Sequence, residues 1–99
     1  MLNISKRTDG KKLTITVEGR LDTTSAPQLE EIVRGQIGDS ETLVFDFEKL
    51  DYISSAGLRV LLAAQKIMNK QGKMVVKSVS EEVKEIFEVT GFCDILTLE

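Results

Sequence analysis

Serine hydroxyls and carboxylates are the side chains of this sequence that could do chemistry, and several of them fall in one short stretch. Ser54 and Ser55 follow Asp51 closely, and Asp46 comes shortly before them. A serine acts as a nucleophile when a nearby base takes its proton, and histidine is the commonest such base near neutral pH. The sequence contains no histidine, so serine–histidine catalysis is excluded. Asp22, Asp46 and Asp51 accompany neither a metal-binding cluster nor a phosphate-cradling glycine motif, so we expect no enzyme activity, cofactor or metal.

Charge and composition restrict the partners and the compartment. The net charge is −3 and the Lys and Arg residues are scattered, so no basic stripe is available for nucleic acid. No apolar run approaches the ~20 residues of a membrane helix, and the first residues lack the organisation of a signal peptide. The single Cys93 cannot form an internal disulfide and is expected to be a buried apolar side chain. We expect one soluble domain over residues 1–99, in the cytoplasm, with no membrane partner.

The N-terminal part of the chain has the pattern of a β-hairpin. Residues 2–7 and 13–18 flank the pair Asp9 and Gly10, which is a strong turn signal. Residues 13–18 alternate between apolar and polar side chains, which is typical of a strand with one face on a core. Two antiparallel strands are therefore expected here.

A loop and a helix should follow this hairpin. Residues 20–24 are predicted to form the loop, and Ser25 with Gln28 three residues later has the form of a capping box. Pro27 is tolerated in the first turn of such a helix. The apolar stripe expected on the helix consists of Leu29, Ile32, Val33 and Ile37.

The middle of the chain predicts a strand, a loop and a second helix. Residues 42–47 form a nearly continuous β-forming run, which indicates a central strand covered on both faces. Asp46 interrupts this run, and a bond to a neighbouring loop is favoured over a catalytic role. Residues 48–57 are predicted to be a loop. A helix is expected from about Ser55 to Lys70, with one apolar side made of Gly57, Val60, Leu61, Ala64, Ile67 and Met68.

Two leucines of this helix lie outside its main apolar arc. Leu58 and Leu62 share a flank with Gln65 and Asn69. They could form the edge of the core or part of a surface for a partner protein.

The C-terminal part predicts a strand, a third helix and a final strand or tail. Residues 74–76 are β-forming, and Ser80 can cap a helix that ends at Gly91. Residues 95–98 make the last strand or tail. Because helical crossovers connect the later strands, these should run parallel. The expected fold is α/β, with a mixed four- to five-stranded sheet, an antiparallel edge hairpin and three to four helices.

Ser54 and Ser55 have a simple structural interpretation. At the start of a helix, Ser54 would be the N-cap and Ser55 the next residue of the first turn. From the residues alone this interpretation is favoured over a functional one.

Three segments together resemble a known family across nearly the whole chain. Residues 19–22 are similar to the family's Gly-Glu-Leu-Asp segment, residues 51–62 to its phosphorylation loop, and residues 80–92 to its last helix. This combination resembles the STAS domain, which is named for sulfate transporters and anti-sigma factor antagonists. The resemblance implies the STAS fold.

The resemblance also implies a phosphorylation site. The family loop commonly reads Asp-Ser-Ser-Gly-Leu or Asp-Ser-Thr-Gly-Leu, and the residue after the Asp is the phosphoacceptor. Counted back from Gly57, that position is Ser55, while Ser54 replaces the Asp and Ala56 stands where a second hydroxyl is usual. The resemblance assigns the following residues to the phosphorylation loop and partner surface: Asp22, Thr23, Thr24, Asp51, Ser54, Ala56, Gly57, Leu58, Arg59 and Leu62.

Resemblance to the stand-alone members implies an anti-sigma factor antagonist. Such a protein binds an anti-sigma factor serine/threonine kinase while unphosphorylated, so that a sigma factor is released. Phosphorylation of Ser55 would end this binding, and a serine phosphatase could restore it. STAS domains also occur in sensor assemblies, anion transporters and lipid transport complexes. A binding module without a phospho-switch is therefore the alternative, and the oligomeric state stays open.

Overall fold

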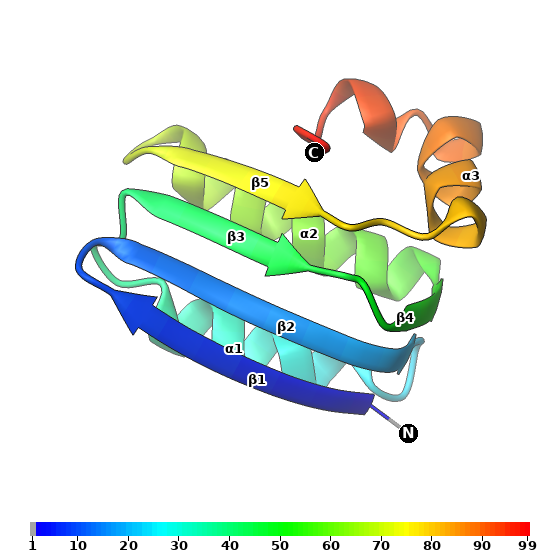
Figure 1. The fold of residues 1–99 in the computed structure, drawn as a ribbon, viewed down its shortest axis with the longest axis horizontal. Coiled ribbons are helices and arrows are strands. Elements are labelled where there is room, and N and C mark those ends of the chain that lie inside the picture. The colour runs from blue at the N-terminus through cyan, green and yellow to red at the C-terminus, as the bar shows by residue number, and fades with distance from the viewer. Residues whose placement is uncertain (1) are drawn as a thin grey trace.

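The computed structural model describes residues 2–99, which form a mixed sheet with helices on one face (Figure 1). The elements are β1 (Leu2–Asp9), β2 (Lys12–Leu21), α1 (Ala26–Gln36), β3 (Thr42–Asp46), β4 (Leu50–Ile53), α2 (Ser55–Asn69), β5 (Lys73–Lys77), α3 (Glu81–Thr90) and a 3₁₀ turn (Phe92–Asp94). The α/β class and the mixed sheet are as the sequence predicted, and the five strands and three α-helices fall within the predicted four to five strands and three to four helices.

The sheet has the strand order β1-β2-β3-β5, with β1 antiparallel to β2 and the other pairs parallel. Gly10 opens the two-residue hairpin turn with a φ of 62°, a conformation that glycine adopts without steric cost. The strands β1 and β2 are longer than predicted, and β2 includes Arg20 and Leu21, for which the sequence predicts a loop. Their pairing with β4 keeps these two residues in the sheet.

The strand β4 was not predicted. It continues the line of β3 along the same side of β2, since Gly19 pairs with Leu50 and Leu21 pairs with Ile53. Between the two strands the chain turns away from the sheet, and the Leu50 N–H donates to the Phe47 carbonyl at 3.0 Å. The loop predicted over residues 48–57 therefore contains a strand, and β4 leads almost directly into α2.

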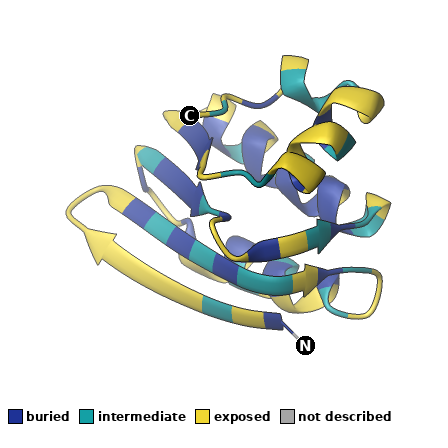
Figure 2. Cartoon of the chain, turned by 45° about the vertical axis from the view of Figure 1, so that its right-hand side comes forward, coloured by how far each residue is buried: buried dark blue, intermediate teal, exposed yellow. Residues whose placement is uncertain are grey.

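The core lies between one face of the sheet and the helices α1 and α2, which lie behind the sheet in Figure 1. Leu13, Ile15 and Val17 of β2 point into it and are at most 1% exposed. Figure 2 shows the resulting alternation along β2 and the mostly exposed edge strand β1. Burial of each large aliphatic side chain stabilises the fold by roughly 1.5–3 kcal/mol.

No helix among residues 2–99 covers the other face of the sheet (Figure 1). The prediction that the strand over residues 42–47 is covered on both faces is therefore wrong. Val44 is still only 8% exposed. It pairs with Thr14 on one side and Val75 on the other, so neighbouring side chains on the same face shield it.

The C-terminal segment packs beside β5, at the edge of the sheet opposite β1. Ser80 caps α3 through a bond from the Val83 N–H, and Gly91 ends it with a φ of 81°, both as predicted. Leu98 then forms an isolated parallel bridge with Val76, so the tail pairs briefly with β5. Cys93 is half-buried against the core, in place of the full burial that was expected.

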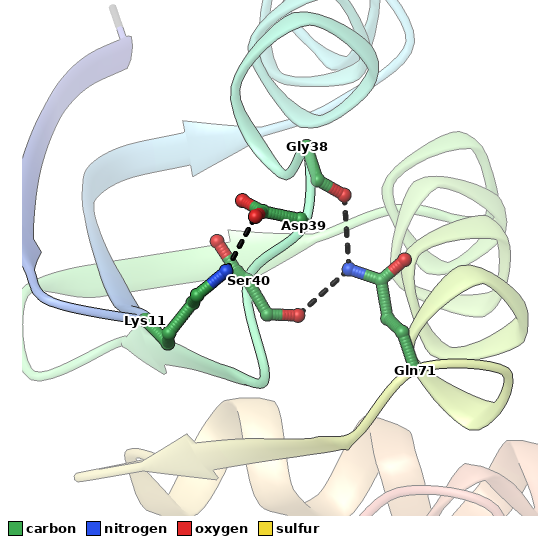
Figure 3. A network of polar contacts seen from close by, with 5 residues as sticks. All are labelled: Lys11, Gly38, Asp39, Ser40 and Gln71. Atoms are coloured by element: carbon green, nitrogen blue, oxygen red, sulfur yellow. Dashed lines mark hydrogen bonds and ion pairs between the residues drawn. The ribbon is translucent and has the colours of Figure 1, made fainter.

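Polar contacts tie three loops together at the end of the sheet where the hairpin turns (Figure 3). Lys11 of the hairpin pairs with Asp39, which follows α1. The Gln71 side-chain amide, after α2, donates to the carbonyls of Gly38 and Ser40 at 3.0 and 2.7 Å. The chain's serine-containing loop lies at the other end of the sheet (Figure 1).

Candidate functional site

Ser54 is the N-cap of α2 and joins the helix to the sheet. Its N–H donates to the Leu21 carbonyl at 2.8 Å, and its hydroxyl oxygen accepts from the Gly57 N–H at 3.4 Å. Its carbonyl accepts the first regular helical bond, from the Leu58 N–H at 2.9 Å. The N-cap role expected for Ser54 is confirmed. This cap fixes the position of the next residue.

Ser55 is the first residue of α2 and its side chain is exposed. Its hydroxyl forms no hydrogen bond with any part of the chain that the structure describes. The N–H groups of Ser55 and Ala56 likewise have no partner within residues 2–99, as is usual at a helix start. The partial positive charge of such a start favours anions. The hydroxyl is thus open to solvent at a point that tolerates added negative charge.

Gly57 lets the start of α2 pack closely on the sheet. A Cβ atom at this position would lie 2.8 Å from Leu21 Cγ and 2.8 Å from Ile53 Cγ1. Such contacts are too short for real side chains, so a larger residue would push the helix away from β2 and β4. Gly57 is buried, and its role in the free protein is packing.

Asp22 organises the loop that follows β2. Its Oδ1 accepts from the Thr24 hydroxyl at 2.8 Å and from the N–H groups of Thr24 and Ser25 at 3.0 and 3.1 Å. The bond from the Thr24 hydroxyl, then that from the Ser25 N–H, lowers the pKa of Asp22 to about 2. Asp22 therefore carries its negative charge throughout the physiological range.

Ser25 does not form the predicted capping box. Its hydroxyl accepts from the Asp22 N–H at 2.9 Å and donates to the Arg20 carbonyl at 2.7 Å. The backbone of Ser25 is already helical, with φ −100° and ψ −19°, and α1 has no side-chain cap. The Ser25 hydroxyl is therefore used by the loop before the helix, where it bonds Asp22 and Arg20, and it does not cap α1.

A shallow groove of about 300 Å³ runs between this loop and the start of α2. Thr23 borders it on one side, and Ala56 and Arg59 border it on the other. The complete lining is Thr23, Ala26, Pro27, Glu30, Ala56, Arg59 and Val60. The structure thus brings together two segments that are more than twenty-five positions apart in the chain. Ala26, Pro27, Glu30 and Val60 were not among the predicted site residues.

The other predicted site residues separate into surface and core. Asp51 of β4 and Thr24 are exposed, and Leu62 is half-buried. Leu58 is only 5% exposed and belongs to the core cluster. Of the two alternatives left open for Leu58, the edge of the core therefore holds in the free protein and the partner surface does not; on the same flank Gln65 is also buried, whereas Asn69 is exposed.

One surface feature near the site was missed. The Arg20 guanidinium stacks on the Tyr52 ring at 4.5 Å from its centroid. The two residues are cross-strand partners in β2 and β4. Only the unrecognised β4 strand could have placed them together, so no local sequence signal was available.

Within residues 2–99, no group of three or more potential metal-binding side chains comes together. None of the helices of this part of the chain has the length and apolar character needed to cross a membrane.

The fold and the site define a class of small α/β protein with an antiparallel edge hairpin, parallel crossovers and an exposed serine at a helix start. A model of the STAS domain matches residues 3–99. The chain belongs to the STAS domain family.

Two relatives are similar over most of their length. BtrV of Bordetella bronchiseptica, whose name assigns it to the anti-sigma factor antagonists, is 40% identical over 85 residues, which are 84% of this chain and 73% of that protein. The anti-sigma-B factor antagonist of Staphylococcus aureus is 30% identical over 97 residues, which are 96% of this chain and 90% of that protein. These names support the antagonist function in general terms.

Solved structures share the fold at lower sequence identity. An anti-sigma factor antagonist from Mycobacterium paratuberculosis superposes with a TM-score of 0.90 at 20% identity, covering 99% of this chain and 85% of that one. The phosphorylated form of the Bacillus cell fate determinant SpoIIAA superposes with a TM-score of 0.76 at 18% identity, covering 98% and 91%. At these identities the likeness establishes the fold.

Proposed function

We propose that this protein is an anti-sigma factor antagonist that is switched off by phosphorylation of Ser55. In its unmodified form it binds an anti-sigma factor that is a serine/threonine kinase, and a sigma factor is released. The role is one of binding and not of catalysis, and it belongs in the cytoplasm, where sigma factors act. The observation that carries the proposal is the exposed Ser55 side chain at the start of α2, beside the groove. The relatives named as antagonists support the same role.

The switch has a direct chemical form. The kinase transfers the γ-phosphoryl group of ATP to the Ser55 Oγ, so the bond from that phosphorus to the bridging oxygen breaks and an Oγ–P bond forms. ADP leaves, and the hydroxyl proton passes to the kinase or to water. A serine phosphatase would hydrolyse the ester and restore the hydroxyl. A phosphorylated form is known for the structural neighbour SpoIIAA, which supports this part of the proposal.

The phosphate should affect binding much more than folding. It adds about −1.5 to −2 charges at pH 7, which the start of α2 accommodates through the open N–H groups. At an interface, an unpaired dianion that loses its water costs several kcal/mol, and each ~1.4 kcal/mol is a tenfold loss of affinity. The carboxylate of Asp22, in the loop that meets α2, would add to this cost.

The assignment of Ser55 is tested with the cognate anti-sigma factor kinase and ATP. Intact mass should show one added phosphate on the wild type, and peptide mapping should place it on Ser55. Ser55→Ala should take up none. Ser54→Ala is the matched control, because it removes the neighbouring hydroxyl and should leave the labelling in place.

Two outcomes would count against the proposal. Labelling of Ser55→Ala would show that the acceptor is another residue. If the wild type binds the anti-sigma factor and takes up no phosphate, the chain is a constitutive binding module, which is the alternative within this family.

A further inference from the structure

Arg59 lies one helical turn after Ser55 on the exposed side of α2. Residues four apart in an α-helix are neighbours on its surface, and helical side chains lean toward the N-terminus. An arginine at position 59 can therefore reach back over the turn that begins with Ser55. The order also suits the helix, since an anion that precedes a cation by four residues is the more stabilising arrangement.

The Arg59 guanidinium is not engaged by another charge. None of the carboxylates within residues 2–99 lies within 4 Å of it. Glu30 lines the same groove, but its Oε2 is 3.1 Å from the Arg34 guanidinium. Asp22 Oδ1 is occupied by donors from Thr24 and Ser25. A phosphate on Ser55 would offer Arg59 a strong acceptor one helical turn away.

We propose that Arg59 pairs with the phosphate of phosphorylated Ser55 in the same chain, and that this pairing withdraws Arg59 from the docking surface. A guanidinium can bond a phosphate through two parallel N–H groups, and such charge-assisted bonds are about twice as strong as neutral ones. The inference rests on the proposed function only for the origin of the phosphate.

This pairing gives the partner surface a defined chemistry. In the unmodified protein Arg59 borders the groove and pairs with no carboxylate of residues 2–99, so it can bond a carboxylate of the anti-sigma factor there. Phosphorylation would then act twice, because it adds negative charge beside that carboxylate and takes away the cation that attracted it. The segment of the partner that meets α2 is therefore expected to be acidic.

The pairing can be measured without any kinase. Phosphoserine is incorporated at position 55 during synthesis of the full chain, and the second pKa of the phosphate, about 6 when free, is followed by ³¹P NMR. A nearby cation favours the dianion and lowers this pKa. Arg59→Gln should therefore raise it by about 0.3 pH unit or more, whereas Arg59→Lys, which keeps the charge, should raise it less.

Lys66→Gln is the matched control. Lys66 is exposed on the same helix, and its loss removes the same charge at a distance from Ser55. If Arg59→Gln and Lys66→Gln change the phosphate pKa equally, the pairing does not exist. That result would not bear on whether the kinase labels Ser55. In the same way, a failure of labelling would not bear on the phosphate pKa measured by NMR, so the two proposals can fail separately.

Discussion

The two adjacent serines have different roles: Ser54 is a structural cap and Ser55 is the candidate site of modification. Ser54 bonds the Gly57 N–H and the Leu21 carbonyl, whereas the Ser55 side chain bonds nothing that the structure describes. The family usually has an Asp at the position of Ser54, and Ser and Asp are comparable N-caps. Ser54 can therefore fill the capping role of that Asp, and Ser55 is the first residue of α2.

These different roles predict unequal effects of two substitutions on the free energy of unfolding. Ser54→Ala should lower the free energy of unfolding by about 1 kcal/mol, because α2 loses its cap. Ser55→Ala should change it by less than about 0.5 kcal/mol, because the hydroxyl is exposed and unbonded. Urea unfolding measures both values. A larger loss for Ser55→Ala than for Ser54→Ala would contradict the assignment.

At the same scale, Asp22 makes a pH-dependent contribution. Its pKa falls from the ordinary 3.8 to about 2, chiefly through the Thr24 hydroxyl. A carboxyl whose pKa is lowered by folding stabilises the folded protein at every pH above its pKa in the unfolded chain. This stabilisation is lost as the pH falls from about 3.8 to about 2. A ¹³C NMR titration of the carboxyl should show a midpoint near 2, and Thr24→Val should move it toward 3.8. A wild-type midpoint already near 3.8 would show that the loop is not held as described.

Among the elements, α2 and β5 are joined by a turn that needs glycine. A Cβ atom on Gly72 would lie 1.9 Å from the Glu41 carbonyl oxygen, which is backbone and cannot move aside cheaply. The same carbonyl accepts from the Lys73 N–H at 3.0 Å, so the pairing of β3 with β5 begins here. Gly72→Ala should therefore cost about 3 kcal/mol.

Gly35 provides the matched control for this substitution. It lies near the end of α1, and a Cβ there would meet nothing within 4 Å. Gly35→Ala should stabilise the protein by about 0.5–1 kcal/mol, because alanine favours the helix. Equal urea midpoints for the two variants would refute the close approach at Gly72.

Elements with strong local signals were predictable from the sequence. Asp9 and Gly10 predict the hairpin, and the cap at Ser80 and the stop at Gly91 predict α3. The strand β4 has only four residues, and its pairing with β2 depends on contacts distant in sequence, so no local pattern revealed it. The capping box at Ser25 failed for a related reason, since its hydroxyl is used by Asp22 and Arg20.

The candidate site was predictable in part for the same physical reasons. The start of α2 follows from local capping, which placed Ser54 and Ser55 correctly. The burial of Leu58 and the groove between α1 and α2 depend on how whole elements pack. Periodicity along one helix could not decide them.

In the whole molecule, stabilising contacts and the candidate site lie at opposite ends of the sheet. The contacts among Lys11, Asp39, Ser40 and Gln71 bind three loops at the hairpin end (Figure 3). The exposed Ser55 and the groove lie at the other end. A phosphate on Ser55 is therefore remote from this network, and we expect the fold to persist after modification.

Binding of the anti-sigma factor by the unmodified and the Ser55-phosphorylated protein, measured by calorimetry beside their unfolding temperatures, tests the central claim most directly. Phosphorylation should weaken binding by about 100-fold or more, because a phosphate that loses its water at the interface costs several kcal/mol and its pairing with Arg59 takes a cation away from the docking surface. The unfolding temperature should move by only a few degrees, at about 4–8 °C per kcal/mol for a domain of this size. Equal affinities of the two forms, or loss of binding that follows from loss of the fold, would contradict the account.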